Sequence, residues 1–167
     1  MRHQVTRECI LGLDLAGSPR RPTGFCVLRG RRVTVGHLFG DEDIFATVAT
    51  VAPHLIAIDA PLGLPAGRCC LLNTCACAGT THFRMSDYEL RRMGIRFFPI
   101  TLGPMRQLTQ RGKHLKAALE DRGLAVIETY PGAAQDIWGI PRQRDVAGLR
   151  RGLSRFRLQG LQRSEAS

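Results

Sequence analysis

Acidic residues are scarce in this chain of 167 residues, which has 14 Asp and Glu against 24 Lys and Arg. Its formal net charge at pH 7 is therefore +10, and its isoelectric point is near 10.4. Such a balance favours polyanionic partners, either nucleic acid or an anionic membrane surface, because phosphate contacts are electrostatic and release counterions. Arginine-rich composition is also typical of GC-rich genomes, so the charge alone does not identify the partner.

Long apolar runs are also absent, and no run approaches the length that spans a membrane. Residues 1–8 are polar, and the apolar run after them stops at Asp14, before it reaches the length of a signal-peptide core. We therefore expect a cytoplasmic protein with no membrane partner. In that compartment its six cysteines are expected to be reduced thiols rather than disulfides.

Aromatic residues are few, with seven Phe, two Tyr and one Trp. None forms the stacking pattern expected of a dedicated single-strand nucleic-acid binder. The apolar fraction of 44% is ordinary for a globular protein, and the length suits one domain with a sizeable core. We predict a single domain over residues 1–160, followed by a polar tail over residues 161–167.

Short apolar runs predict strands, and amphipathic or acid-capped segments predict helices. The predicted strands are residues 10–15, 24–28, 32–38, 55–59 and 124–128. The predicted helices are residues 41–51, 86–93, 104–122, 133–138 and 145–156. The first three strands would form an antiparallel meander, and the fourth would pair in parallel with the first. This order indicates an α/β fold of the RNase H-like (ribonuclease H and resolvase) type, a mixed five-stranded sheet with flanking helices.

Three of the predicted strands end in or next to an acid, and these acids are Asp14, Asp59 and Glu128. Asp14 interrupts an apolar run, so we expect a buried carboxylate that needs compensation, because an unpaired charge taken out of water is costly. The simplest compensation is a divalent cation shared by Asp14 and Asp59, and hard carboxylate oxygens suit Mg²⁺ or Mn²⁺. Glu128 would be a third ligand or water orienter, or would form a structural ion pair.

Four motifs carry a family resemblance: residues 12–19 with Thr23 and Gly24, residues 58–63, residues 91–99 and residues 127–133. Together they resemble a family of predicted nucleases called domain of unknown function 429, which is assigned an RNase H fold. The resemblance implies that Asp14, Asp59 and Glu128 are catalytic acids and that the first two bind the metal. Two divalent ions about 4 Å apart would then hydrolyse a phosphodiester bond.

The same resemblance implies that one catalytic acid is not accounted for, because an RNase H-type site usually takes a final acid from a C-terminal helix. Asp136 and Asp145 are the only acids between Glu128 and Glu165, and both fall where predicted helices begin, a position that needs no catalytic explanation. It therefore stays open whether the chain is a shortened relative that lacks this helix and has impaired activity.

Nucleic-acid contacts are predicted at two places. The first is the loop after the first strand, with Ser18, Arg20 and Arg21, although a solvated turn explains these residues equally well. The second is a basic track through the middle helices, which would offset the repulsion between the acids and a phosphate backbone, although solvated helix faces are the default for such charges. Its residues are Arg91, Arg92, Arg96, Arg106, Arg111, Lys113 and Lys116.

A cysteine-rich segment contains Cys69, Cys70, Cys75 and Cys77, with His82 nearby. Zinc is the metal that four such ligands would bind, but Cys75 and Cys77 are closer in sequence than the usual ligand pairs. The spacing therefore favours ordinary reduced cysteines and keeps zinc as an alternative.

These observations predict a divalent-metal-dependent nuclease that acts on DNA or RNA. One alternative is a nucleic-acid-binding RNase H-like domain without catalysis. Another is a nucleotide-binding phosphotransferase relative, since a Gly/Ser loop beside an Asp also holds phosphates in sugar kinases, although the chain is too short for the two domains those enzymes need.

Overall fold

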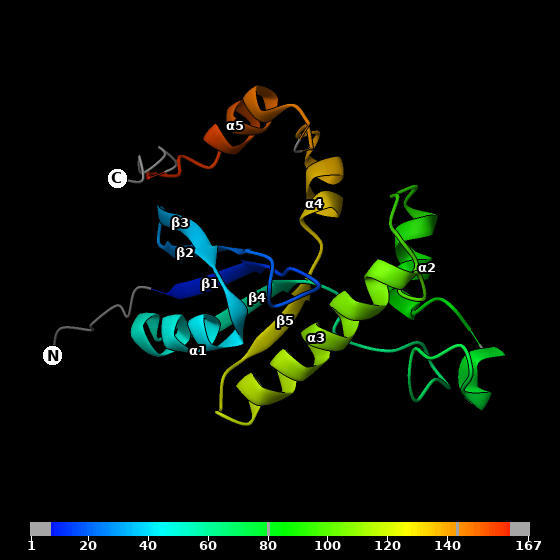
Figure 1. The fold of residues 1–167 in the computed structure, drawn as a ribbon. Helices are drawn as coiled ribbons and strands as arrows, with labels where there is room; N and C mark the ends of the chain where they lie inside the picture. The colour runs from blue at the N-terminus through cyan, green and yellow to red at the C-terminus, as the bar shows by residue number, and fades with distance from the viewer. Residues whose placement is uncertain (1–7, 80, 143, 161–167) are drawn as a thin grey trace, which may run out of the picture.

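The computed structural model describes residues 8–79, 81–142 and 144–160. Within them, five strands form one mixed sheet in the order β3-β2-β1-β4-β5 (Figure 1). The strands are β1 (Cys9–Asp14), β2 (Thr23–Arg29), β3 (Arg32–Leu38), β4 (Leu55–Asp59) and β5 (Val126–Thr129). The first three pair antiparallel, whereas β4 pairs in parallel with β1 and with β5. This arrangement confirms the predicted RNase H-like α/β fold, while the predicted polar tail lies outside the described residues.

The helices of the described residues are α1 (Gly40–Val51), α2 (Met85–Arg92), α3 (Gly103–Glu120), α4 (Pro131–Trp138) and α5 (Val146–Ser154), with a short 3-10 helix η1 (Ala76–Gly79). Three acids in the first turn of α1 suit its positive N-terminal end. Pro104 lies in the first turn of α3, and Gly123, with a φ of +78°, lets the chain leave that helix toward β5. No helix in this part of the chain is long and apolar enough to cross a membrane.

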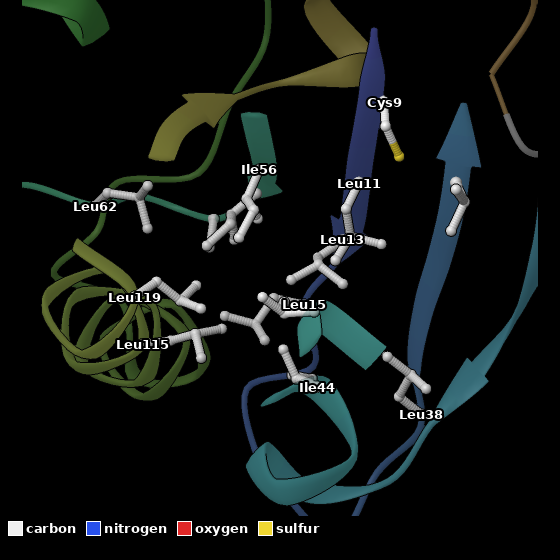
Figure 2. Packing of buried hydrophobic residues seen from close by; sticks show 14 residues of the cluster. Cys9, Leu11, Leu13, Leu15, Leu38, Ile44, Ile56, Leu62, Leu115 and Leu119 are labelled. Carbon is white, nitrogen blue, oxygen red and sulfur yellow. The ribbon is translucent and has the colours of Figure 1, made fainter. Parts of the chain in front are cut away.

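The core lies between one face of the sheet and helices α1 and α3. Figure 2 shows Leu11 and Leu13 of β1 pointing toward Ile44 of α1 and Leu119 of α3. Alternate residues of β1 are buried because successive side chains of a strand point to opposite faces. This packing fixes β1 and β4 in the centre of the sheet, and with them the two acids at their ends.

An irregular segment, residues 60–84, connects β4 to α2 and contains four of the cysteines. Its only regular element among the described residues is η1. In Figure 1 this green segment extends away from the sheet beyond α2. Its cohesion therefore has to come from something other than the sheet.

Candidate functional site

Asp14 and Asp59 end two neighbouring parallel strands. The register pairs Leu13 of β1 with Ile58 of β4, so the following residues, Asp14 and Asp59, lie side by side as the last residues of the two strands. In the pairing of β4 with β5, Glu128 lies opposite Ile58. All three line one cleft of about 590 Å³, as the strand-end pattern predicted.

We call this cleft the acidic cleft, because five carboxylates and one arginine line it. Those charged residues are Asp14, Asp59, Asp87, Glu89, Glu128 and Arg84. The remaining walls include Ser86, Phe97, Phe98, Met105, Leu108 and Tyr130. Carboxylates thus face a partly apolar wall to which α2 and α3 contribute.

Arg111 of α3 fixes the end of β1 where Asp14 lies. Its buried guanidinium donates a 2.6 Å hydrogen bond to the carbonyl of Ala16 and pairs with Asp41 at 2.7 Å. Gly24 lies opposite Asp14 on β2, where a Cβ would make an ordinary van der Waals contact of 3.4 Å with the Cβ of Asp14. The backbone that carries Asp14 is therefore positioned by the sheet register and, two residues further on, by a buried arginine.

The expectation that Asp14 is buried was wrong. Its backbone lies at the end of β1, where the alternation of buried residues stops, and the residue is exposed to the cleft. The apolar run in the sequence continues past Asp14 to Leu15, which is buried. The run therefore did not indicate that the strand ends at Asp14. Solvent reaches the carboxylate, and a ligand in the cleft could reach it as well.

Asp59 is the most perturbed acid of the cleft. Burial, together with the negative charges of Asp14 and Glu128, raises its pKa to about 6. Neither Asp14 nor Asp59 has a hydrogen-bonding or ion-pairing side-chain partner among the described residues. The two adjacent acids thus repel each other without a protein cation to offset the repulsion.

Glu128 is in a different situation, because Arg84 holds it. The guanidinium Nη1 of Arg84 donates to both carboxylate oxygens at 2.7 and 2.8 Å, and the backbone N–H of Leu62 donates to Oε2 at 2.7 Å. Arg84 also pairs at 2.8 Å with Asp87, which is 1% exposed. The structural ion pair predicted as one possible role of Glu128 is thus present in the structure.

The fifth acid of the cleft, Glu89, is also paired. Glu89 accepts a hydrogen bond from Arg92 at 2.7 Å on the surface of α2. Arg84, Asp87 and Glu89 were missed as site residues because they are distant in sequence from the strand-end acids. The one available signal was the spacing of Arg84 and Asp87, which is suited to an ion pair across one helical turn.

A second cleft, of about 530 Å³, adjoins the first and shares Phe97, Phe98 and Tyr130 with it. We call it the aromatic cleft; its other lining residues are Phe83, Arg91, Ile95, Arg96, Pro99 and Arg142. The ring of Phe83 contacts that of Phe97 edge to face, and Arg91 lies 5.1 Å from the Phe83 ring centre. Aromatics separated in sequence thus gather here, which a linear pattern did not indicate.

The predicted nucleic-acid contacts divide between these places. Arg91 and Arg96 line the aromatic cleft. Arg92 instead pairs with Glu89 on the exposed side of α2. The expectation that Arg111 belongs to an exposed basic track was wrong, because it is buried and pairs with Asp41. Ser18, Arg20 and Arg21 form a turn after β1 that is not part of either cleft lining, and the Ser18 hydroxyl accepts a hydrogen bond from the backbone N–H of Arg20.

The two late acids have structural partners. Asp136 lies within α4 rather than at its start and accepts a 2.9 Å hydrogen bond from Nε of Arg142. Asp145 caps α5 by accepting the backbone N–H of Gly148 at 2.8 Å. Neither lines the acidic cleft, so within the described residues α4 and α5 add no acid to it.

The four cysteines of the irregular segment come together at one point. Their sulfur atoms all lie within 4.8 Å of one another, and we call this group the cysteine cluster. In the described part of the chain it is the one set of three or more Cys, His, Asp or Glu residues gathered so closely, and His82 is not part of it. The spacing of these cysteines in the sequence did not indicate such a gathering.

Comparison with known proteins identifies the family but no characterised relative. The family described as "Protein of unknown function (DUF429)" matches residues 12–165. No curated protein matches the chain, and no solved structure matches it. The match covers nearly the whole chain and includes all four motifs that carried the resemblance, and the chain therefore belongs to the DUF429 family.

Proposed function

We propose that this protein is a divalent-metal-dependent nuclease that hydrolyses phosphodiester bonds in the acidic cleft. The observation that carries the proposal is the pairing pattern of the cleft acids. Asp87, Glu89 and Glu128 each have an arginine, whereas Asp14 and Asp59, at the ends of adjacent parallel strands, have no partner among the described residues. Two adjacent carboxylates without a counter-ion favour a cation between them.

The donor set fits Mg²⁺ or Mn²⁺. Asp14 and Asp59 offer hard carboxylate oxygens, and the exposed position of Asp14 leaves room for the waters that Mg²⁺ retains. When bound, the metal would supply Lewis-acid activation of the phosphate and of a water nucleophile. Asp59 must lose its proton to act as a ligand, and with a pKa of about 6 it does so at neutral pH.

The remaining residues of the two clefts would position the substrate. Glu128 is held by Arg84 and Leu62, so it would define one wall and orient water rather than move with the metal. Arg91 and Arg96 would contact phosphates, because guanidinium groups fork onto phosphate oxygens. Phe98, which is 70% exposed, offers a ring on which an unpaired base could stack.

The test is cleavage of DNA, RNA and hybrid substrates with Mg²⁺ or Mn²⁺ by the wild type, Asp14→Asn and Asp59→Asn. Asp121→Asn is the matched control, because Asp121 is an exposed acid at the end of α3, outside the acidic cleft. The proposal expects metal-dependent cleavage by the wild type and the control only. Equal cleavage by Asp14→Asn would overturn it.

A second candidate function is nucleic-acid binding without catalysis. The ion pair between Arg84 and Glu128 favours it, since a third acid held in this way is not free to bind a metal. This alternative predicts salt-sensitive binding that does not change in Asp14→Asn, with no cleavage under any metal condition.

A further inference from the structure

The sulfur atoms of the cysteine cluster are arranged at close to the spacing of a single tetrahedral metal. The sulfur–sulfur separations are 3.3 Å for Cys75–Cys77, 3.5 Å for Cys69–Cys75, 3.5 Å for Cys69–Cys77 and 3.9 Å for Cys70–Cys77. A zinc ion at about 2.3 Å from each of four sulfurs places them about 3.8 Å apart. A disulfide would need about 2.05 Å, and an iron–sulfur cluster would force the sulfurs apart with its own atoms.

Local backbone geometry brings the two cysteine pairs together despite their short spacing. A turn at residues 73–74 reverses the chain, and the backbone N–H of Ala78 in η1 donates to the carbonyl of Cys75 at 2.8 Å. Cys69 and Cys70 then face Cys75 and Cys77 across this turn. The spacing that argued against zinc is therefore accommodated by the turn and the 3-10 helix.

Apolar packing does not account for this gathering. Cys69 is exposed, and the other three cysteines are only partly buried. Between Cys69 and Gly79, Leu71 is the one buried hydrophobic residue. Segments that lack a hydrophobic core commonly depend on a metal or on disulfides for their structure.

Arg68 gives a second, independent indication. Its side chain belongs to a residue only 7% exposed and donates to the carbonyls of Cys70, Ala78, Thr81 and Leu72 at 3.1, 3.2, 3.3 and 3.5 Å. Among the described residues no carboxylate pairs with it. A buried guanidinium needs a counter-charge, and a zinc ion with four thiolates, which carries a net charge of −2, would supply one beside it.

We propose that Cys69, Cys70, Cys75 and Cys77 bind one zinc ion in a structural site. Four protein ligands fill the tetrahedral shell, so no position stays open for a substrate, which distinguishes a structural from a catalytic zinc. The zinc would hold the irregular segment in place up to Arg84, the residue that pairs with Glu128 in the acidic cleft. The proposal does not depend on nuclease activity.

The experiment uses the full-length chain purified under reducing conditions, with metal content measured by mass spectrometry and with Co²⁺ as a spectroscopic substitute. The matched pair of variants is Cys75→Ser in the cluster and Cys26→Ser in β2. We expect one zinc per chain and thiolate-to-cobalt charge-transfer bands in the wild type and in Cys26→Ser. Cys75→Ser should bind the metal at least roughly tenfold more weakly. Removing a residue that only hydrogen-bonds to a metal ligand already lowers metal affinity by about that factor, and Cys75 would be a ligand itself.

Thiol alkylation provides a test that does not depend on a variant folding. In the zinc-loaded wild type the four cluster cysteines should resist alkylation until a chelator is added. Folded, reduced wild type that contains no stoichiometric zinc and gives no thiolate–cobalt bands would overturn the proposal. So would bound iron with the spectrum of an iron–thiolate centre in place of zinc.

Discussion

The acidic cleft and the cysteine cluster are two candidate metal sites built on different scaffolds. The acids stand at the ends of β1 and β4, where sheet register and core packing fix them, and the cleft is open to ligands. The cysteines lie on an irregular segment and gather more tightly than the acids do. An open site with hard oxygen ligands suits exchangeable Mg²⁺ and chemistry, whereas a closed site with soft sulfur ligands suits permanent zinc and structure.

This contrast predicts that metal loss has opposite consequences at the two sites. Losing the metal of the acidic cleft should abolish activity and leave the fold intact. Losing the metal of the cysteine cluster should loosen residues 60–84 while the sheet remains folded. Each of the following changes tests one side of the contrast.

The largest expected effect is on activity in Asp14→Asn. The substitution removes a charge that would bind the metal, so cleavage should fall below detection. Because Asp14 is exposed, the free energy of unfolding should stay within about 0.5 kcal/mol of wild type. Measurements of the cleavage rate and of urea unfolding on the same variant check the activity and the stability. A loss of stability large enough to explain the lost activity would contradict the assignment of Asp14 as a metal ligand.

Arg84→Ala should have the largest effect on stability, because Arg84 connects the two regions. It ends the irregular segment and pairs with both Asp87 and Glu128, and removing its side chain leaves the buried carboxylate of Asp87 without a cation. The expected loss is about 3 kcal/mol in the free energy of unfolding.

Arg92→Ala is the control for this prediction, since its pair with Glu89 is exposed on both sides and should be worth about 1 kcal/mol or less. Chemical denaturation of both variants gives the comparison. Equal losses in the two would show that the Arg84 pairs stabilise no more than a surface ion pair.

Zinc removal should have a smaller and more local effect. With free zinc at 100 times its Kd, binding to the folded chain contributes about 2.7 kcal/mol, which a chelator would remove. Hydrogen exchange should then accelerate in residues 60–84 and stay slow in β1 and β4. Exchange that does not change on chelation, or that accelerates equally in the sheet, would contradict a local structural role.

The last effect is the pH dependence contributed by Asp59. Its pKa in the folded, metal-free protein is about 6, above the ordinary value near 3.8, so the folded state favours the protonated form. The stabilisation that the protonated Asp59 gives to the folded state is fully present below about pH 4 and is lost as the pH rises through about 6. Asp59→Asn should therefore become more stable relative to wild type across this window.

Urea unfolding from pH 4 to pH 7 in the presence of EDTA measures this difference. A stability difference between wild type and Asp59→Asn that stays constant over the range would show that the pKa of Asp59 is not raised. Mg²⁺ binding should weaken below pH 6 for the same reason, because the proton competes with the metal.

Sequence patterns predicted the sheet well because they depend on local alternation. The strand runs and the apolar core followed from residue periodicity, and the parallel pairing of two strands that each end in an acid was enough to place Asp14 near Asp59. The same reasoning failed on the burial of Asp14, because an apolar run does not show where a strand ends.

Contacts between distant segments could not be predicted from local patterns. Arg84 and Glu128 are separated by 44 positions, and nothing in the local pattern connects them. The aromatic cleft combines Phe83, Phe97 and Tyr130 for the same reason. The cysteine-rich segment was recognised in the sequence, but its spacing favoured ordinary reduced thiols, because ligand-spacing rules describe common turns and not the tight turn that this segment forms.

The central claim is that Asp14 and Asp59 bind a divalent cation in the acidic cleft. Calorimetric titration of Mn²⁺ into zinc-loaded wild type, Asp14→Asn, Asp59→Asn and Asp121→Asn tests it most directly. We predict binding by the wild type and Asp121→Asn, and loss of binding in both cleft variants. Equal Mn²⁺ affinity in all four proteins, or no binding by any of them at neutral pH, would contradict it.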